Sequence, residues 1–340
     1  MARDVEHALH EALSFGITLF DVSADADSER LAGTAVREHG ARDRVVLATR
    51  VPVLTERAGR PRRDVLPERL PPPHVQDRIE AALRATRLDA LPLAQLPLQV
   101  AWLASSAWPE LVGTCARLVR EGKVLAWGAI LDDAAVGSPA GGRAPAPGAA
   151  GDRARPIEPP IEPPPTLATV IHQPWLAALS VVYNLCDRRA EPLFELAAQR
   201  KSAMAILARQ PLAGSALAGN LGPGVRLTPR DDRNGLDEPT LIRVAAGAAR
   251  LSRLVKRAPP AATSCDAARA AAEHTARPEH LECADVAELA LRFAIDRAGI
   301  ALPRLHRREH LLPAVAAATA PPLSAEIGTR AREAADASIH

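Results

Sequence analysis

Two charged residues stand at the ends of short apolar segments. An enzyme built on a parallel sheet has its catalytic residues at the ends of its strands. Asp21 ends the apolar run 17–21, and Arg50 ends the run 44–50, which is rich in β-branched residues. The helical segment between them makes a strand, helix, strand unit, and that unit requires a parallel sheet. We therefore expect an ion pair between Asp21 and Arg50 that either takes part in chemistry or simply neutralises both charges.

Side chains that could move a proton are scarce around this pair. Asp25 and Asp27 follow Asp21, and they could act as general acid or base only if burial raised their affinity for protons. A helix N-cap and a solvated loop explain them without any chemistry. Tyr183 is the single tyrosine of the chain, and it falls on a different strand.

One motif suggests a metal. Residues 306–310 read His-Arg-Arg-Glu-His and match the H-x-x-E-H pattern of inverted zinc peptidases, in which two histidines one helical turn apart share a metal. The pattern fixes only three positions, and no acidic ligand follows at the spacing of those peptidases. We predict no metal site.

Composition excludes several classes of partner. The formal charge of +2 comes from 42 basic and 40 acidic residues spread over 340 positions, so no basic stripe is offered to nucleic acid. No apolar run approaches the roughly 18 residues of a membrane-spanning helix, and the N-terminus lacks the order of a signal peptide. With no C-x-x-C pair among its four cysteines, the protein is expected to be cytoplasmic, without nucleic acid or membrane as partner.

Helical and strand patterns alternate along the chain. Apolar residues at helical spacing predict helices at 4–14 with Asp4 as N-cap, 28–39, 74–86, 108–121, 187–201, 239–255 and 285–297. Short apolar runs predict strands at 17–21, 44–50, 88–96 (weakened by Pro92), 124–130, 179–184, 202–214 together with a turn, and 299–305.

Three stretches interrupt this alternation. Residues 55–73 are predicted to be a loop, and 258–282 a second irregular insertion. Residues 132–165 are dominated by proline and glycine and are predicted to be a disordered or polyproline insertion. A role as a proline-rich ligand is the alternative for 132–165, but an inert insertion is favoured because the paired P-x-x-P and basic signature is missing.

Five segments resemble the aldo-keto reductases. They are Asp21 with Ser28-Glu29, EGKVLAWGA at 121–129, Tyr183-Asn184 with Asp187-Arg188, RQPLAG at 209–214, and LALRF at 289–293. The resemblance implies one α/β domain over residues 1–340, a (β/α)8 barrel of the TIM-barrel type. Seven strands match and the first is missing, so we expect its gap to be closed by a shifted segment or a second chain, or the true start to lie upstream.

The resemblance also implies a catalytic tetrad of tyrosine, lysine, aspartate and histidine that serves hydride transfer from a nicotinamide to a carbonyl. Asp21 retains the aspartate, and Arg50 takes the position of the lysine. Ala26 takes the position of the tyrosine and Pro97 that of the histidine, and neither side chain can donate a proton.

Cofactor contacts implied by the resemblance are partly lost. Ile130-Leu131 replace a Ser-Asn pair, and Ser180 replaces a glutamine, at the nicotinamide ring. The pyrophosphate loop persists as Gln210, Leu212 and Gly214, where backbone amides would bind. At the second phosphate site Arg304, His306 and Arg307 are basic, but the expected glycine is missing. NADP binding is therefore expected to be weakened.

Together these changes predict an aldo-keto reductase family protein with a degenerate site, a pseudoenzyme for hydride transfer. It would be a non-redox enzyme or a protein that binds a small molecule or a partner chain, and its open barrel edges could support a homo-oligomer. The alternative is an NAD(P)H-dependent carbonyl oxidoreductase that works through a substituted site.

Overall fold

The structure is a computed structural model. It describes residues 2–57, 60–61, 63, 65–131, 166–219, 238–255, 283–304 and 308–336. The predicted insertion 132–165, the predicted insertion 258–282, and both His306 and Arg307 lie outside these ranges.

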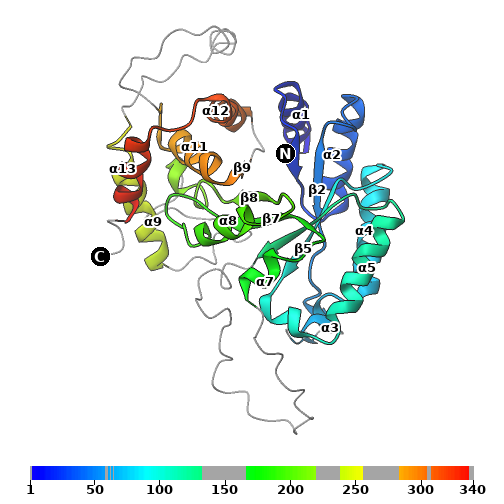
Figure 1. The fold of residues 1–340 in the computed structure, drawn as a ribbon. Helices are drawn as coiled ribbons and strands as arrows, with labels where there is room; N and C mark the ends of the chain where they lie inside the picture. The colour runs from blue at the N-terminus through cyan, green and yellow to red at the C-terminus, as the bar shows by residue number, and fades with distance from the viewer. Residues whose placement is uncertain are drawn as a thin grey trace. The chain divides into compact units, whose positions relative to one another are not determined.

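Seven strands of the described chain form one sheet, in the order β1-β2-β5-β6-β7-β8-β9 (Figure 1). Their bounds are β1 Leu19–Asp21, β2 Val46–Arg50, β5 Leu93–Leu98, β6 Trp127–Leu131, β7 Leu176–Val182, β8 Ala205–Arg209 and β9 Gly299–Leu302. The described ladders are parallel, and strands alternate with helices along the chain. The predicted (β/α) barrel fold is confirmed.

The chain divides into two compact units. The first unit comprises Met1–Phe15, Val182–Arg188 and Ile206–His340, and the second comprises Gly16–Val181 and Arg189–Ala205. Each unit is thus built from segments that are separated in the sequence.

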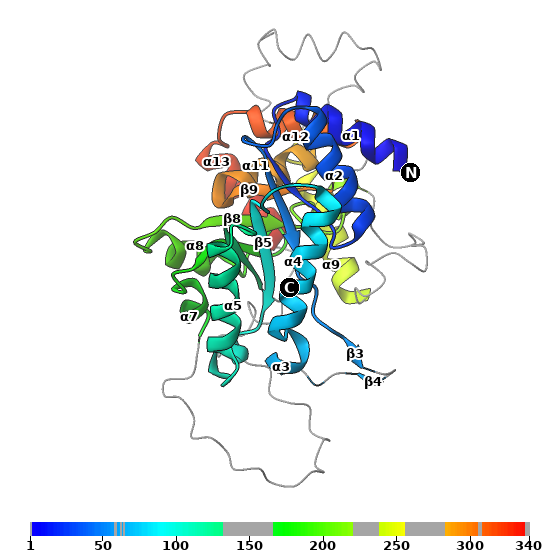
Figure 2. The same ribbon diagram turned by 90° about the vertical axis from the view of Figure 1, so that its right-hand side faces the viewer.

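In the second unit, helices pack beside the ladder from β1 to β7. They are α2 Ala26–Glu38, α3 Leu66–Arg69, α4 Pro72–Thr86, α5 Trp108–Arg120, α7 Leu167–Ile171 and α8 Glu191–Ala198, with the 3-10 helix η1 Val100–Ala104. Figure 2 shows α2, α4 and α5 next to one another. A β carbon on Gly33 of α2 would lie only 2.2 Å from the carbonyl oxygen of Thr86 on α4, so this close approach requires glycine.

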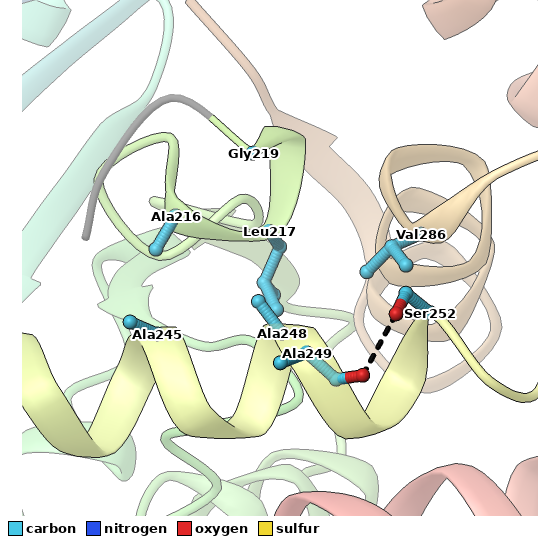
Figure 3. A pocket seen from close by; sticks show the side chains of 8 residues that line it. All are labelled: Ala216, Leu217, Gly219, Ala245, Ala248, Ala249, Ser252 and Val286. Carbon is cyan, nitrogen blue, oxygen red and sulfur yellow. Dashed lines mark hydrogen bonds between the residues drawn. The ribbon is translucent and has the colours of Figure 1, made fainter. Parts of the chain in front are cut away.

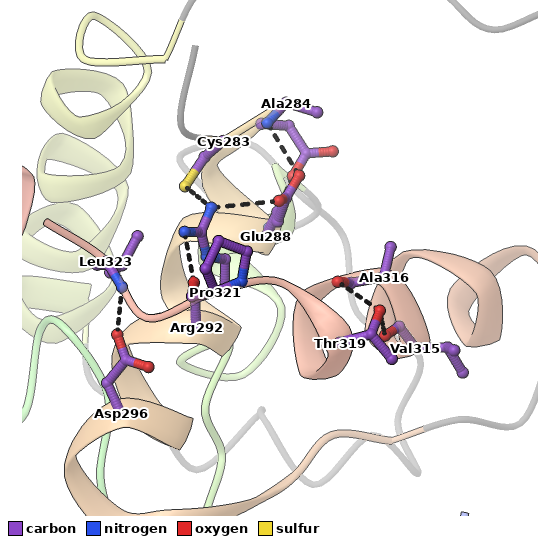
Figure 4. Close-up of polar contacts among 11 residues, drawn as sticks. Cys283, Ala284, Glu288, Arg292, Asp296, Val315, Ala316, Thr319, Pro321 and Leu323 are labelled. Atoms are coloured by element: carbon purple, nitrogen blue, oxygen red, sulfur yellow. Dashed lines mark hydrogen bonds and ion pairs between the residues drawn. The ribbon is translucent and has the colours of Figure 1, made fainter. Parts of the chain in front are cut away.

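The first unit holds β8, β9 and most of the later helices. These are α1 Ala2–Ser14, α9 Glu238–Leu251, α11 Val286–Ala298, α12 Arg308–Thr319 and α13 Ala325–Asp336, with the 3-10 helix η2 Ala216–Ala218. Buried Arg292 of α11 donates to Cys283 Sγ at 3.3 Å and to the carbonyl of Pro321 at 2.8 Å (Figure 4). The guanidinium thereby ties α11 to the segment between α12 and α13.

Several predicted boundaries were wrong. Helix α1 begins at Ala2, so Asp4 is inside the helix and is not its N-cap. Strand β5 starts at Leu93, which places Pro97 rather than Pro92 within the strand. The predicted loop 55–73 contains α3 and a hairpin of β3 Glu56–Arg57 with β4 Arg60–Pro61.

Besides α3, three further α-helices of the described chain were not predicted from the sequence. Helix α7 has only five residues, and its start is stabilised by a capping box between Thr166 and Thr169. Helices α12 and α13 are rich in alanine, which blurs the apolar periodicity, and α12 contains Pro313. In the part of the chain that the structure describes, no helix has the length and apolar character needed to cross a bilayer.

Candidate functional site

The predicted ion pair of Asp21 and Arg50 is present at the ends of β1 and β2. Arg50 Nε donates to Asp21 Oδ1 at 3.1 Å, and Arg50 Nη2 contacts Asp21 Oδ2. The guanidinium therefore binds the carboxylate through two parallel contacts, a bidentate geometry that a lysine could not form. The Asp21 side chain is 8% exposed, whereas that of Arg50 is 37% exposed.

A third residue, Gln95 of β5, completes this group. Register pairs Gln95 with Arg50, and Gln95 Nε2 donates to Asp21 Oδ1 at 3.1 Å. Gln95 is fully buried, and its Oε1 has no hydrogen-bond partner among the described residues. Sequence reasoning missed this residue, although its place on the same strand and two positions before Pro97 could have signalled a shared face of the sheet.

Ala26 and Pro97 belong to the same unit as Asp21, and neither has a polar atom in its side chain. Ala26 is the first residue of α2 and is exposed. Pro97 lies in β5 beyond the last residue paired with β2, because Val51 donates to the carbonyl of Gln95 and the ladder then ends. A missing N–H is tolerated at this point of the strand.

The remaining groups considered for proton transfer have structural roles. Asp25 is the N-cap of α2 and accepts from the Ser28 amide at 2.8 Å, as predicted. Asp27 pairs with Arg30 on the surface at 3.4 Å. Tyr183 is fully buried and stacks on Phe293 with ring centroids 5.7 Å apart. The Asp21 carboxylate thus has Arg50 as its charged partner and Gln95 as a neutral donor, and neither Ala26 nor Pro97 carries an acidic or basic group.

In the first unit, the loop after β8 adopts an unusual backbone. Gln210, Ala213 and Ser215 have φ of 52°, 48° and 75°, a left-handed region that costs free energy for residues other than glycine. Gly214 has φ of 64° and meets the same demand without strain. Strain of this kind is characteristic of ligand-binding loops.

Asn184 and Leu212 hold this loop in place. Asn184 Nδ2 donates to the carbonyl of Gln210 at 3.1 Å, and Asn184 Oδ1 accepts from the amides of Cys186 and Asp187 at 2.9 Å. Leu212 packs against a buried cluster of Leu291, Ala314 and Ala317. Leu212 is therefore an anchor of the loop, and the exposed Gln210 is the residue that a ligand could reach.

A pocket of about 290 Å³ lies just beyond the loop, in the first unit (Figure 3). Its lining comes from η2, α9 and the start of α11 and consists of Ala216, Leu217, Gly219, Ala245, Ala248, Ala249, Ser252 and Val286. The Ser252 hydroxyl donates to the carbonyl of Ala249 at 2.7 Å. None of these lining residues is charged, so the pocket suits a small apolar group.

Of the predicted second phosphate site, only Arg304 is described, where it is exposed after β9. His306 and Arg307 lie outside the described residues, and so the H-x-x-E-H motif is described only from Arg308 onward. The described residues contain no group of three potential metal ligands.

The residues predicted to replace the nicotinamide contacts are apolar or short. Leu131 of β6 is fully buried, and Ile130 pairs in register with Ser180 of β7. Ser180 is fully buried, and its Oγ has no hydrogen-bond partner within the described ranges. A single serine hydroxyl on a buried strand cannot span the distance that a glutamine side chain covers.

The comparison with family models matches the first part of the chain. Residues 2–133 match the sequence model of the aldo/keto reductase family. No curated protein matches the chain.

Solved structures match over nearly the whole chain. Aldo-keto reductase AKR11C1 from Bacillus halodurans, in its holo form, is 18% identical with a TM-score of 0.61 and covers 97% of this chain and 86% of its own. Glycerol dehydrogenase AKR11B4 from Gluconobacter oxydans is 16% identical with a TM-score of 0.64, covering 99% and 85%. An aldo/keto reductase from Klebsiella pneumoniae in complex with NADP and acetate is 21% identical with a TM-score of 0.56, covering 98% and 85%. Residues 2–133 are thus similar in sequence to the aldo/keto reductase family, and the chain shares the fold of the matching structures.

Proposed function

We propose that this chain is an aldo-keto reductase relative that uses its barrel for binding, or for chemistry other than hydride transfer. The observation that carries the proposal is the closed group of Asp21, Arg50 and Gln95, beside which Ala26 and Pro97 occupy the positions of the tyrosine and the histidine. The acid that would protonate a substrate carbonyl has no replacement in this group.

The expected kinetic cost is large. A positioned general acid contributes roughly 10² to 10⁴ in rate, and Arg50 is a permanently charged fork that cannot release a proton as a lysine can. The ion pair instead serves to hold the ends of β1 and β2 together.

A nicotinamide dinucleotide, when bound, supplies a hydride, and the residues present fit its two halves unequally. The strained loop from Gln210 to Ser215 and the exposed Arg304 suit phosphate oxygens. Ile130 and the short, buried Ser180 do not suit a carboxamide. We therefore propose weakened NADP binding through the phosphates, with the ring poorly held.

The alternative function is an NAD(P)H-dependent carbonyl oxidoreductase that acts through a substituted site. It is favoured by structural neighbours whose descriptions include NADP, NADPH and glycerol dehydrogenase activity. Under this alternative, a proton donor other than the side chain at position 26 would be required.

Two measurements separate the candidates. NADPH fluorescence should quench or shift only at high protein concentration, because NADP binding is weakened. NADPH oxidation with a panel of aldehydes should stay at background. Turnover that is abolished by Asp21→Ala but retained by the surface control Asp89→Ala would overturn the proposal. Absence of any fluorescence change would favour a partner-binding role over a repurposed cofactor pocket.

A further inference from the structure

We infer that Arg50 and Gln95 form a site for a small uncharged molecule that carries an N–H or O–H donor next to an oxygen acceptor, the chemistry of a primary amide. This inference rests on the proposed function, because it assigns a ligand class to the same group of residues. Three observations support it.

The first observation concerns charge. Arg50 is a cation at the end of β2, and the carboxylate of Asp21 neutralises it through two parallel contacts. An anionic ligand would have to compete with Asp21, and it would gain little net attraction from a neutralised pair. An uncharged molecule with an acceptor oxygen can still receive a hydrogen bond from the guanidinium, whose side chain remains 37% exposed.

The second observation concerns the acceptor. Gln95 Nε2 is committed to Asp21 Oδ1 at 3.1 Å, and this fixes the orientation of the amide. Gln95 Oε1 therefore stays an acceptor, fully buried and without a partner among the described residues. Such an atom in a folded protein calls for a donor from a water or a ligand.

The third observation concerns position. Gln95 Nε2 and Arg50 Nε share one oxygen of Asp21, each at 3.1 Å, so the amide and the guanidinium lie next to each other. On the same face, Pro97, Ile130 and Ser180 form the next row of the sheet. Ser180 Oγ, also buried and without a partner among the described residues, adds a second polar atom two strands away. The inference therefore rests on Gln95 Oε1 beside the Arg50 guanidinium, and Ser180 lies outside the proposed site.

The test uses the whole protein with acetamide as the probe and acetate as its charged match. Saturation-transfer NMR should detect acetamide but not acetate, and Gln95→Met should weaken acetamide binding by about tenfold, the loss of one hydrogen bond. Gln173→Met is the matched control. Gln173 donates to the carbonyl of Thr169 and accepts from the indole N–H of Trp175, both nearby in the sequence. This variant should leave acetamide binding unchanged.

A second variant keeps the test informative if Gln95→Met does not fold. Arg50→Lys retains the charge but loses the planar fork, and it should also weaken acetamide binding several-fold. Equal binding of acetate and acetamide, or binding unaffected by both variants, would overturn the inference, as would a crystal soaked in acetamide that holds only water at Gln95 Oε1. These outcomes are independent of NADPH fluorescence and turnover, the two measurements that decide the proposed function.

Discussion

Asp21 is the residue whose partners define the candidate site, and its removal should be felt in stability. Asp21→Ala leaves Arg50 without its counter-charge and removes the acceptor of Gln95, so we expect the free energy of unfolding to fall by about 2 kcal/mol. Urea unfolding monitored by fluorescence measures it.

The matched control is Asp89→Ala, because Asp89 pairs with Arg42 at 3.5 Å with its own side chain 97% exposed. Exposed pairs of this kind contribute little, so this variant should stay within about 0.5 kcal/mol of the parent protein. Equal losses in the two variants would mean that the Asp21 group has no special role in the fold.

Cys115 should make the stability of the protein depend on pH in the alkaline range. Burial on α5 raises the pKa of the Cys115 thiol from an ordinary value of 9.0 to about 12. The folded state therefore keeps a proton that the unfolded state loses above pH 9. The contribution to stability is complete below pH 9, and it falls by about 1.4 kcal/mol per pH unit as the pH rises toward 12.

Comparing the protein with Cys115→Ala isolates this titration. The difference in the free energy of unfolding between the two proteins should be constant up to about pH 8.5 and should then shift in favour of the variant by about 1 kcal/mol at pH 10. Parallel curves across this range would show that Cys115 is reached by solvent in the folded state.

At the scale of elements, Gly33 sets the distance between α2 and α4. Gly33→Ala would place a β carbon 2.2 Å from the carbonyl oxygen and 2.6 Å from the Cα of Thr86, both backbone atoms that cannot rotate away. We expect a loss of roughly 1–3 kcal/mol in the free energy of unfolding, because the two helices must separate. Thermal unfolding followed by circular dichroism measures the loss.

Gly113→Ala on α5 is the matched control, since no atom beyond its own helix lies within 4 Å of the added carbon. Alanine has the higher helix propensity, so this variant should be unchanged or more stable by up to about 1 kcal/mol. If Gly33→Ala behaved in the same way, the packing of α2 on α4 would have to be looser than the structure has it.

At the scale of the whole molecule, the two units interleave along the chain. A cut after residue 150 puts β1, β2, β5 and β6 on one fragment and β7, the next strand of the same ladder, on the other. Each fragment alone would present an unpaired strand edge, which favours association with other chains.

We therefore expect residues 1–150 and 151–340 to aggregate when produced separately and to form a defined complex when produced together. Size-exclusion chromatography with light scattering distinguishes the two results. A monomeric 1–150 fragment with cooperative unfolding would mean that the ladder from β1 to β6 is stable without β7.

Local patterns in the sequence were sufficient to predict alternating strands and helices around a parallel sheet. Apolar periods and glycine stops depend on neighbours within one turn or one strand, so they predicted seven strands and most helices correctly. They also placed Asp21 and Arg50 correctly at the ends of adjacent parallel strands. They failed where the pattern is weak, at the alanine-rich α12 and α13 and at the start of β5.

Only the tertiary structure decided which side chains meet. Gln95 reaches Asp21 across 74 positions of sequence, and that contact depends on the register of β1, β2 and β5, which periodicity alone does not set. The left-handed backbone at Ala213 and Ser215 could not be predicted either, because alanine and serine normally avoid that conformation. It depends on contacts of the loop with Asn184 and on the packing of Leu212. Sequence alone predicted the resemblance to a family and the pair of Asp21 and Arg50, whereas the third member of that group, Gln95, follows from packing between distant segments.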